Sequence, residues 1–158
     1  MQVEFDVQID TGAIFDYMIK QAYSGTPGIA AAAAGAVLLL LFGRTGNAFC
    51  LAAGLIVLAG FPALLYRKAK RREKDPDFGG PVHYRLTEEG MEAVRPGKRD
   101  FRKWEEVERA VSTTKSVLVL LPGSDACIFP REQLKDSLIP AVEMISTHVP
   151  AKKVNIRM

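Results

Sequence analysis

Two long apolar stretches separated by a short polar turn dominate the pattern of hydrophobic and polar positions in this 158-residue chain. Between residues 27 and 66, Arg44 is the only charged residue. The apolar runs on either side of it have the length and composition of membrane-spanning helices. The pattern therefore predicts a transmembrane hairpin over residues 27–66, with helices at about 27–43 and 47–66.

The two predicted helices differ in hydrophobic strength. The first is rich in alanine, and an apolar run of its length reaches only about 24 Å, short of a bilayer core of roughly 30 Å. The second reaches about 30 Å and carries larger leucine, isoleucine and phenylalanine side chains, with Pro62 as a predicted kink. We therefore expect the two helices to insert together.

The N-terminal segment before the hairpin carries two different periodicities. Residues 3–10 alternate apolar and polar side chains, which is typical of a strand with one buried face. Because such a strand needs a sheet, we expect it to join the C-terminal half of the chain across the hairpin. A helix is predicted from Asp10 or Thr11 to about Tyr23, ended by Gly25 and Pro27. This helix is predicted either to lie at the membrane interface or to pack on the C-terminal domain.

The C-terminal half reads as short extended segments followed by a helix. Gly- and Pro-containing turns separate six predicted strands: Val82–Leu86, Met91–Arg95, Asp100–Trp104, Val107–Thr113, Ser116–Leu121 and Ala126–Phe129. A helix is predicted from Arg131 to about His148, with a kink or break at Pro140. The expected fold is an α+β membrane protein, a two-helix transmembrane hairpin plus an antiparallel β meander with a C-terminal helix. Its expected divisions are 1–26, the hairpin 27–66, a basic linker 67–81 and a cytoplasmic domain 82–158.

The positive charge is concentrated directly after the second apolar stretch. Six basic residues follow it within eight positions: Arg67, Lys68, Lys70, Arg71, Arg72 and Lys74. Over residues 75–158, by contrast, the numbers of acidic and basic residues are equal. By the positive-inside rule this cluster places both termini in the cytoplasm, with the turn at Arg44 outside. The expected location is a bacterial inner membrane. Because the folded half is charge-balanced, no nucleic acid is expected as a partner.

A second basic group lies near the only tryptophan. It consists of Lys98, Arg99, Arg102 and Lys103. Both basic groups are candidate contacts for anionic lipid headgroups, with a solvated surface as the alternative for the second, because Glu105, Glu106 and Glu108 follow closely. Trp104 is expected in the core, and the Phe129-Pro130-Arg131 step is expected to end a strand and begin a helix.

Small residues recur at four-residue spacing within the hairpin. They are Gly28, Ala32 and Ala36, Ala31 with Gly35, and Ala59 with Ala63. Such spacing permits close helix approach, either within the hairpin or between protomers of a homo-oligomer.

No constellation for catalysis or metal binding is evident. His83 and His148 stand apart without Cys or carboxylates at ligand spacing, and Cys50 and Cys127 fall in different compartments of the predicted topology. The chain also lacks the glycine-rich, GxSxG and HExxH motifs. We expect no enzymatic activity, no cofactor and no metal.

Three segments carry a resemblance to a known family. They are residues 84–91 (YRLTEEGM), 104–107 (WEEV) and 128–134 (IFPREQL). Their order after a two-helix hairpin resembles the bacterial YcxB-like family, which implies a C-terminal domain similar to a pleckstrin-homology (PH-like) fold. Arg131-Glu132 stands where a pair of basic residues is expected, which speaks against an anion site at that step. The resemblance implies architecture and no activity.

The expected function is a membrane-tethered interaction or regulatory module without catalysis, with an unknown protein partner. Two alternatives remain. One is an anionic-lipid sensor at the inner-membrane face, and the other is an accessory subunit of a transport or envelope complex.

Overall fold

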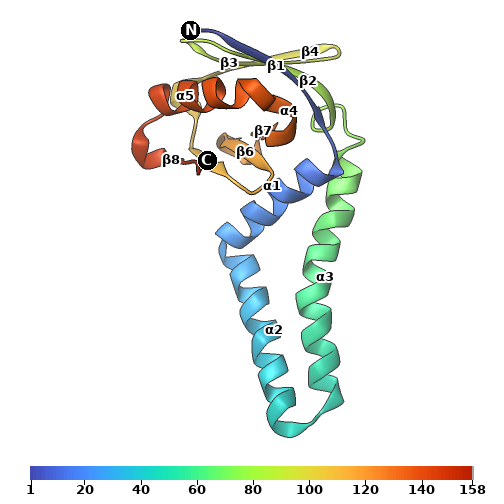
Figure 1. The fold of residues 1–158 in the computed structure, drawn as a ribbon. Helices are drawn as coiled ribbons and strands as arrows, with labels where there is room; N and C mark the ends of the chain where they lie inside the picture. Colours follow the sequence, from blue (N-terminus) through green and yellow to red (C-terminus); the bar gives the residue numbers. More distant parts are fainter. Residues whose placement is uncertain (158) are drawn as a thin grey trace.

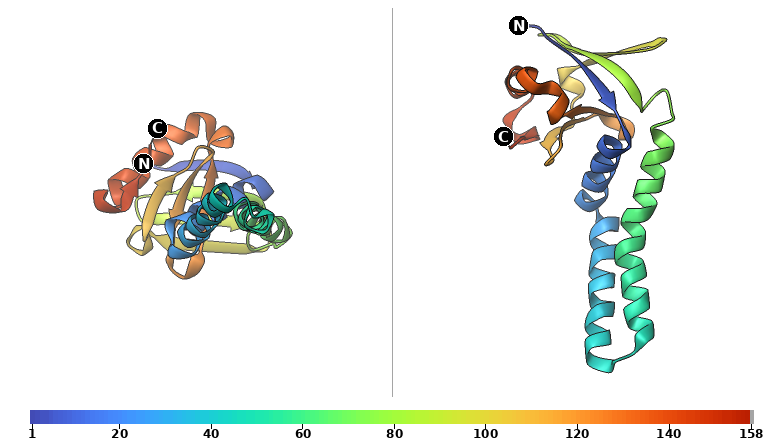
Figure 2. Two further views of the ribbon diagram at one scale, coloured as in Figure 1. Left: turned by 90° about the horizontal axis from the view of Figure 1, so that it is seen from below. Right: turned by 45° about the vertical axis from the view of Figure 1, so that its right-hand side comes forward.

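The protein consists of an α+β domain and a hairpin of two long helices that projects from it (Figure 1). The computed structural model describes residues 1–157. Because the hairpin follows the first strand in the chain, the domain is assembled from segments on both sides of it. Helix α1 (Thr11–Ser24) lies between the domain and the hairpin (Figures 1 and 2).

The hairpin consists of α2 (Thr26–Thr45) and α3 (Ala48–Arg72), which run side by side (Figure 2). Gly46 ends α2 with a φ of 67°, a left-handed conformation that glycine adopts without steric cost. The Asn47 side chain then caps α3 by accepting a hydrogen bond from the backbone N of Phe49 at 2.9 Å. Both helices are long and apolar enough to cross a membrane. The predicted pair of helices is confirmed.

Helix α3 continues to Arg72, beyond the predicted end at residue 66. The basic residues that were expected in a linker therefore stand largely on helix, since no glycine or proline interrupts them and cations are favoured near a helix C-terminus. An exit loop, residues 73–79, follows. It folds back on itself, with the backbone N of Gly79 donating to the carbonyl of Asp75 at 2.9 Å. Gly79 is buried, so the connection between α3 and the domain is short and packed against its surroundings.

Two glycines allow α2 and α3 to pack closely. A Cβ on Gly35 would lie 2.5 Å from Cγ of Leu58, and one on Gly54 would lie 3.0 Å from Cδ2 of Leu39. The predicted close approach within the hairpin is therefore found at Gly35. Other members of the small-residue repeats are exposed on the outer faces of the helices: Ala36, Ala59 and Ala63.

The N-terminal strand β1 (Val3–Ile9) pairs antiparallel with β2 (Gly80–Leu86), and Phe5 stands opposite Tyr84. Its odd-numbered side chains are buried and its even-numbered ones exposed. The prediction that this segment joins the C-terminal half across the hairpin is confirmed.

Helix α1 contacts both parts of the molecule. Asp10 caps it by accepting from the backbone N of Ala13 at 2.8 Å. One face joins the domain core through Ile14, Tyr17 and Met18. The other meets α3 through edge-to-face ring contacts, Phe15 with Tyr66 at 5.5 Å and Tyr23 with Phe61 at 5.9 Å. Of the two predicted positions, the structure shows packing on the domain, combined with contact to the hairpin.

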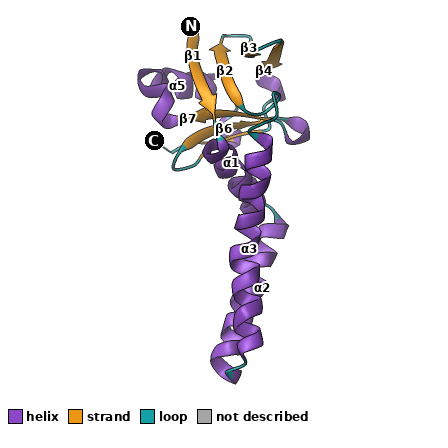
Figure 3. Ribbon diagram, turned by 90° about the vertical axis from the view of Figure 1, so that its right-hand side faces the viewer, coloured by secondary structure: helices purple, strands orange, loops and turns teal. Residues whose placement is uncertain are grey.

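The strands form two four-stranded sheets where a single meander was expected (Figure 3). The first sheet has the order β1-β2-β3-β4 and is antiparallel, with β3 at Gly90–Arg95 and β4 at Lys98–Lys103. The second has the order β7-β6-β5-β8: Ala126–Pro130, Ser116–Leu120, Arg109–Ser112 and Val154–Asn155. Two 3-10 turns lie between strands, at Trp104–Glu106 and Pro122–Ser124. The first of them separates the sheets, which is why the predicted meander does not continue past β4.

The C-terminal region contains a helical segment that is broken once. Helix α4 (Arg131–Leu134), a 3-10 turn (Lys135–Ser137) and α5 (Leu138–His148) follow Pro130, which ends β7 and caps α4 as predicted. The break is at Lys135, with a φ of 44°, and not at Pro140. Pro140 lies in the first turn of α5, where its missing N–H removes no helical hydrogen bond. A last 3-10 turn (Ala151–Lys153) leads to β8, which pairs in parallel with β5 and was not predicted.

Aromatic side chains hold the two sheets together. Phe129 of β7 makes edge-to-face contacts with Phe5 at 5.3 Å and with Tyr84 at 4.8 Å between ring centroids. Trp104 is buried, and its indole N–H donates to the Thr87 carbonyl at 2.8 Å. The predicted core position of Trp104 is confirmed, although it lies in a turn and not on a strand.

Candidate functional site

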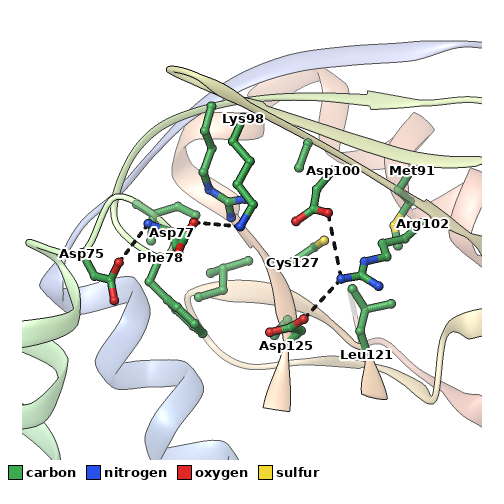
Figure 4. Close-up of a pocket in the computed structure, with 15 residues that line it drawn as sticks. Asp75, Asp77, Phe78, Met91, Lys98, Asp100, Arg102, Leu121, Asp125 and Cys127 are labelled. Atoms are coloured by element: carbon green, nitrogen blue, oxygen red, sulfur yellow. Dashed lines mark hydrogen bonds and ion pairs between the residues drawn. The ribbon is translucent and has the colours of Figure 1, made fainter. Parts of the chain in front are cut away.

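A cleft of about 370 Å³ opens between the two sheets beside the exit loop (Figure 4). Alternate side chains of β3 and β4 face it from the first sheet, since Met91, Ala93 and Arg95 stand opposite Arg102, Asp100 and Lys98 in the strand register. Strand β7 supplies Cys127 and Ile128 from the second sheet, and Asp75, Asp77 and Phe78 of the exit loop form one wall. The floor is apolar and the rim is charged.

Most of the rim charges are paired with one another (Figure 4). Lys98 Nζ donates to Asp77 Oδ1 at 2.7 Å, which joins β4 to the exit loop. This hydrogen bond lowers the pKa of Asp77 and raises the pKa of Lys98. Arg102 lies between two carboxylates, at 3.4 Å from Asp125 and 4.0 Å from Asp100.

Arg95 differs from these cations. It is half-buried in the cleft wall, and its Nε is buried without a hydrogen-bond acceptor. Within residues 1–157, none of the ion pairs involves its guanidinium. A buried guanidinium N–H without a partner is costly, and a carboxylate or phosphate matches its donor geometry. Arg95 therefore keeps a buried donor available for an anionic group, although Asp77 in the same cleft is close enough for the Arg95 charge to help lower its pKa.

Cys127 lines the cleft floor, and the buried Tyr84 hydroxyl lies beside it. Burial raises the pKa of the Cys127 thiol to about 11, so the thiol stays protonated at neutral pH. Burial also raises the pKa of the neighbouring Tyr84 hydroxyl. His83 lies on the outer face of the first sheet, 2.8 Å from Asp6, and His148 stacks on Trp104. Over the described residues, three or more His, Cys, Asp or Glu side chains nowhere gather in a metal-binding arrangement.

The first predicted basic group forms a collar at the domain end of α3. Five of its members are exposed and make no ion pair in the described part of the chain: Arg67, Lys68, Lys70, Arg71 and Lys74. Arg72 is half-buried, and its guanidinium stacks over the Phe78 ring at 4.4 Å from the ring centroid. This contact packs the exit loop against the end of α3. Ala69, on the opposite side of the helix from most of these cations, is fully buried against the domain. The collar therefore points away from the domain.

The second predicted basic group is divided between two faces of β4. Lys98 and Arg102 face the cleft and are ion-paired. Arg99 and Lys103 lie on the exposed outer face, where Arg99 is 4.0 Å from Glu92. The four residues thus do not form one surface, and the first sheet lies at the end of the domain away from the hairpin (Figure 1). The structure does not bring this group together with the collar.

The cleft was missed at the sequence level, although one signal pointed to it. Met91, Ala93 and Arg95 occupy alternating positions of a predicted strand, so the pattern already placed Arg95 on a face with apolar residues. The carboxylates at Asp77 and Asp125 gave no such signal, because each lies in a turn where aspartate is common.

Comparison with protein-family models, curated proteins and solved structures finds no match to this chain.

Proposed function

We propose that this protein is a membrane-tethered, non-catalytic binding module whose cleft receives an extended segment of a protein partner. The observation that carries the proposal is Arg95, a half-buried cation that forms none of the ion pairs of residues 1–157 and whose Nε lacks an acceptor, in a cleft with an apolar floor. The partner segment would supply a carboxylate to Arg95 and an apolar side chain to the floor. The proposal includes a PH-like domain of the YcxB-like type, in keeping with the sequence resemblance.

The position of the cleft supports a regulatory role. The exit loop that connects α3 to β2 forms one of its walls, and the Lys98–Asp77 ion pair joins that wall to β4. Movement of the hairpin would therefore change the width of the cleft, and a bound segment would in turn bias the hairpin. Strand β4 is an edge strand, so its outer backbone groups are free to pair with an extended segment.

Photo-cross-linking tests this proposal. With a photoreactive amino acid in place of exposed Asp125, the full-length protein should give one defined protein adduct in cells. Arg95→Met should reduce that adduct more than tenfold, because a hydrogen-bonded charge pair is worth about 1.5–3 kcal/mol. The matched control is Arg99→Met, which removes the same side chain from the outer face of the same β-hairpin. Equal loss in both variants would contradict binding at Arg95. An adduct within a large membrane complex would identify the protein as an accessory subunit.

The proposed location is a bacterial inner membrane with both termini in the cytoplasm. The observation behind it is that six basic residues follow α3 closely, whereas Arg44 stands alone at the turn between the helices. Reporter fusions after Gln21, at Thr45 and at Met158 should therefore report inside, outside and inside. A C-terminal reporter that is exported would refute this topology.

Anionic-lipid sensing is a second candidate function, favoured by the five exposed collar cations. Basic residues near an anionic surface contribute about 1 kcal/mol each, less after screening by salt. Because the second basic group is split and partly paired, the collar would provide most of this attraction.

A further inference from the structure

An apolar groove of about 500 Å³ runs along the outer side of the hairpin and ends at a cation. Its walls include Ala31 of α2 and Ile56, Phe61 and Leu64 of α3. The only charged residue that lines it is Arg67, the first member of the collar.

Gly60 keeps this groove open. A Cβ at this position would meet only Cγ2 of Ile56, at 4.0 Å, which is an ordinary contact distance. By contrast, the Cβ positions of Gly35 and Gly54 are occupied by side chains of the opposite helix. Gly60 therefore has no part in close packing of α2 against α3, and a larger side chain there would project into the groove.

Arg67 offers an unneutralised charge at the end of the groove nearest the domain. It is exposed, and in the described residues no carboxylate pairs with it. Lys70 and Arg71 follow at helical spacing on the same side of α3, and Lys74 lies in the turn after the helix. An occupant with an apolar body and an anionic head would satisfy both parts of this surface.

We propose that the groove is a binding site for one anionic glycerophospholipid, with an acyl chain over Gly60 and the phosphate on Arg67. This inference goes beyond the proposed function and rests only on its membrane location. The charge of the collar favours an anionic occupant over two alternatives. A zwitterionic lipid would bring an ammonium group toward the collar. A second copy of the chain would bring its own collar against Arg67. Both are disfavoured by repulsion between like charges.

Native mass spectrometry of the full-length protein tests the site. The protein would be purified in mild detergent and offered equal amounts of dioleoyl phosphatidylglycerol and dioleoyl phosphatidylcholine. Each protein molecule should retain one phosphatidylglycerol in preference to phosphatidylcholine. Arg67→Gln should lower this preference about five-fold, the effect of one cation at an anionic headgroup. Enlarging Gly60 to Ala, Val and Leu should lower retention of the lipid progressively.

Matched controls separate this site from general attraction. Lys68→Gln removes a neighbouring exposed cation that does not line the groove, and Gly43→Leu makes the same enlargement at an open position of α2. Both should retain the lipid. Equal loss with Lys68→Gln, or equal retention of the two lipids by the unaltered protein, would overturn the proposal. Retention of a second protein chain would also overturn it. Because the cleft residues are unchanged, Arg95-dependent cross-linking would persist even if the lipid site failed.

Discussion

A carboxylate at position 7 is expected to unfold the α+β domain, whereas a carboxylate at position 8 is expected to leave it folded. Val7 is 3% exposed in β1 and stands opposite Val82, so Val7→Asp places a charge among apolar side chains. Burial of an unpaired charge costs on the order of 4 kcal/mol or more, a large part of the stability of an ordinary domain. Gln8 lies on the exposed face of the same strand.

Fluorescence of Trp104 measures the outcome, because it is the only tryptophan and is buried in the domain. Purified Val7→Asp protein should show red-shifted emission and no cooperative thermal transition, and Gln8→Asp should match the unaltered protein. The pair also tests the register, since a slip of one residue exchanges the two faces of a strand. A folded Val7→Asp variant would mean that β1 does not belong to the sheet.

The second large effect is expected from Phe129→Ala. Phe129 is fully buried and contacts the rings of Phe5 and Tyr84, so it links β7 of the second sheet to β1 and β2 of the first. Truncation of a buried phenylalanine costs about 3–5 kcal/mol through lost burial and the cavity that remains. The midpoint of chemical denaturation, followed by Trp104 emission, should fall strongly.

Phe101→Ala provides the control for this experiment. Phe101 is 48% exposed on the outer face of β4, so its truncation should change the free energy of unfolding by less than about 0.5 kcal/mol. If the two alanine variants were equally stable, the aromatic cluster would not be the connection between the sheets.

The architecture restricts how the domain can move relative to the hairpin. The chain enters α1 from β1 and returns from α3 through the exit loop, so two connections join the parts. Side-chain contacts add to them, including the ring pair of Phe15 with Tyr66 and a hydrogen bond from the Thr11 hydroxyl to Glu73. A domain attached in this way keeps its cleft within a limited range of orientations relative to the hairpin. This is the property that a tethered binding module needs, because it lowers the cost of meeting a partner in the same membrane.

The sequence was sufficient to predict the collar but not the cleft. The collar was found from the local charge pattern, because its six cations lie within eight residues of the chain and their exposure needs no distant partner. The cleft was not found, because Arg95, Asp77 and Asp125 come from three separate segments. The second basic group was also treated as one surface in the sequence. Only the strand register separates Lys98 and Arg102, which face the cleft, from Arg99 and Lys103.

The sequence by itself determined the elements whose signals are local. Two apolar runs determined the hairpin, strict alternation determined the buried face of β1, and the polar segment 43–47 indicated the turn, since each depends on side chains within one segment. The structure narrows that turn to Gly46 and Asn47. Tertiary structure alone decided the division into two sheets, the parallel pairing of β8 with β5, and which cleft cation has a buried donor without an acceptor. These features depend on residues far apart in the chain, and their energies arise only when folding brings those residues into contact.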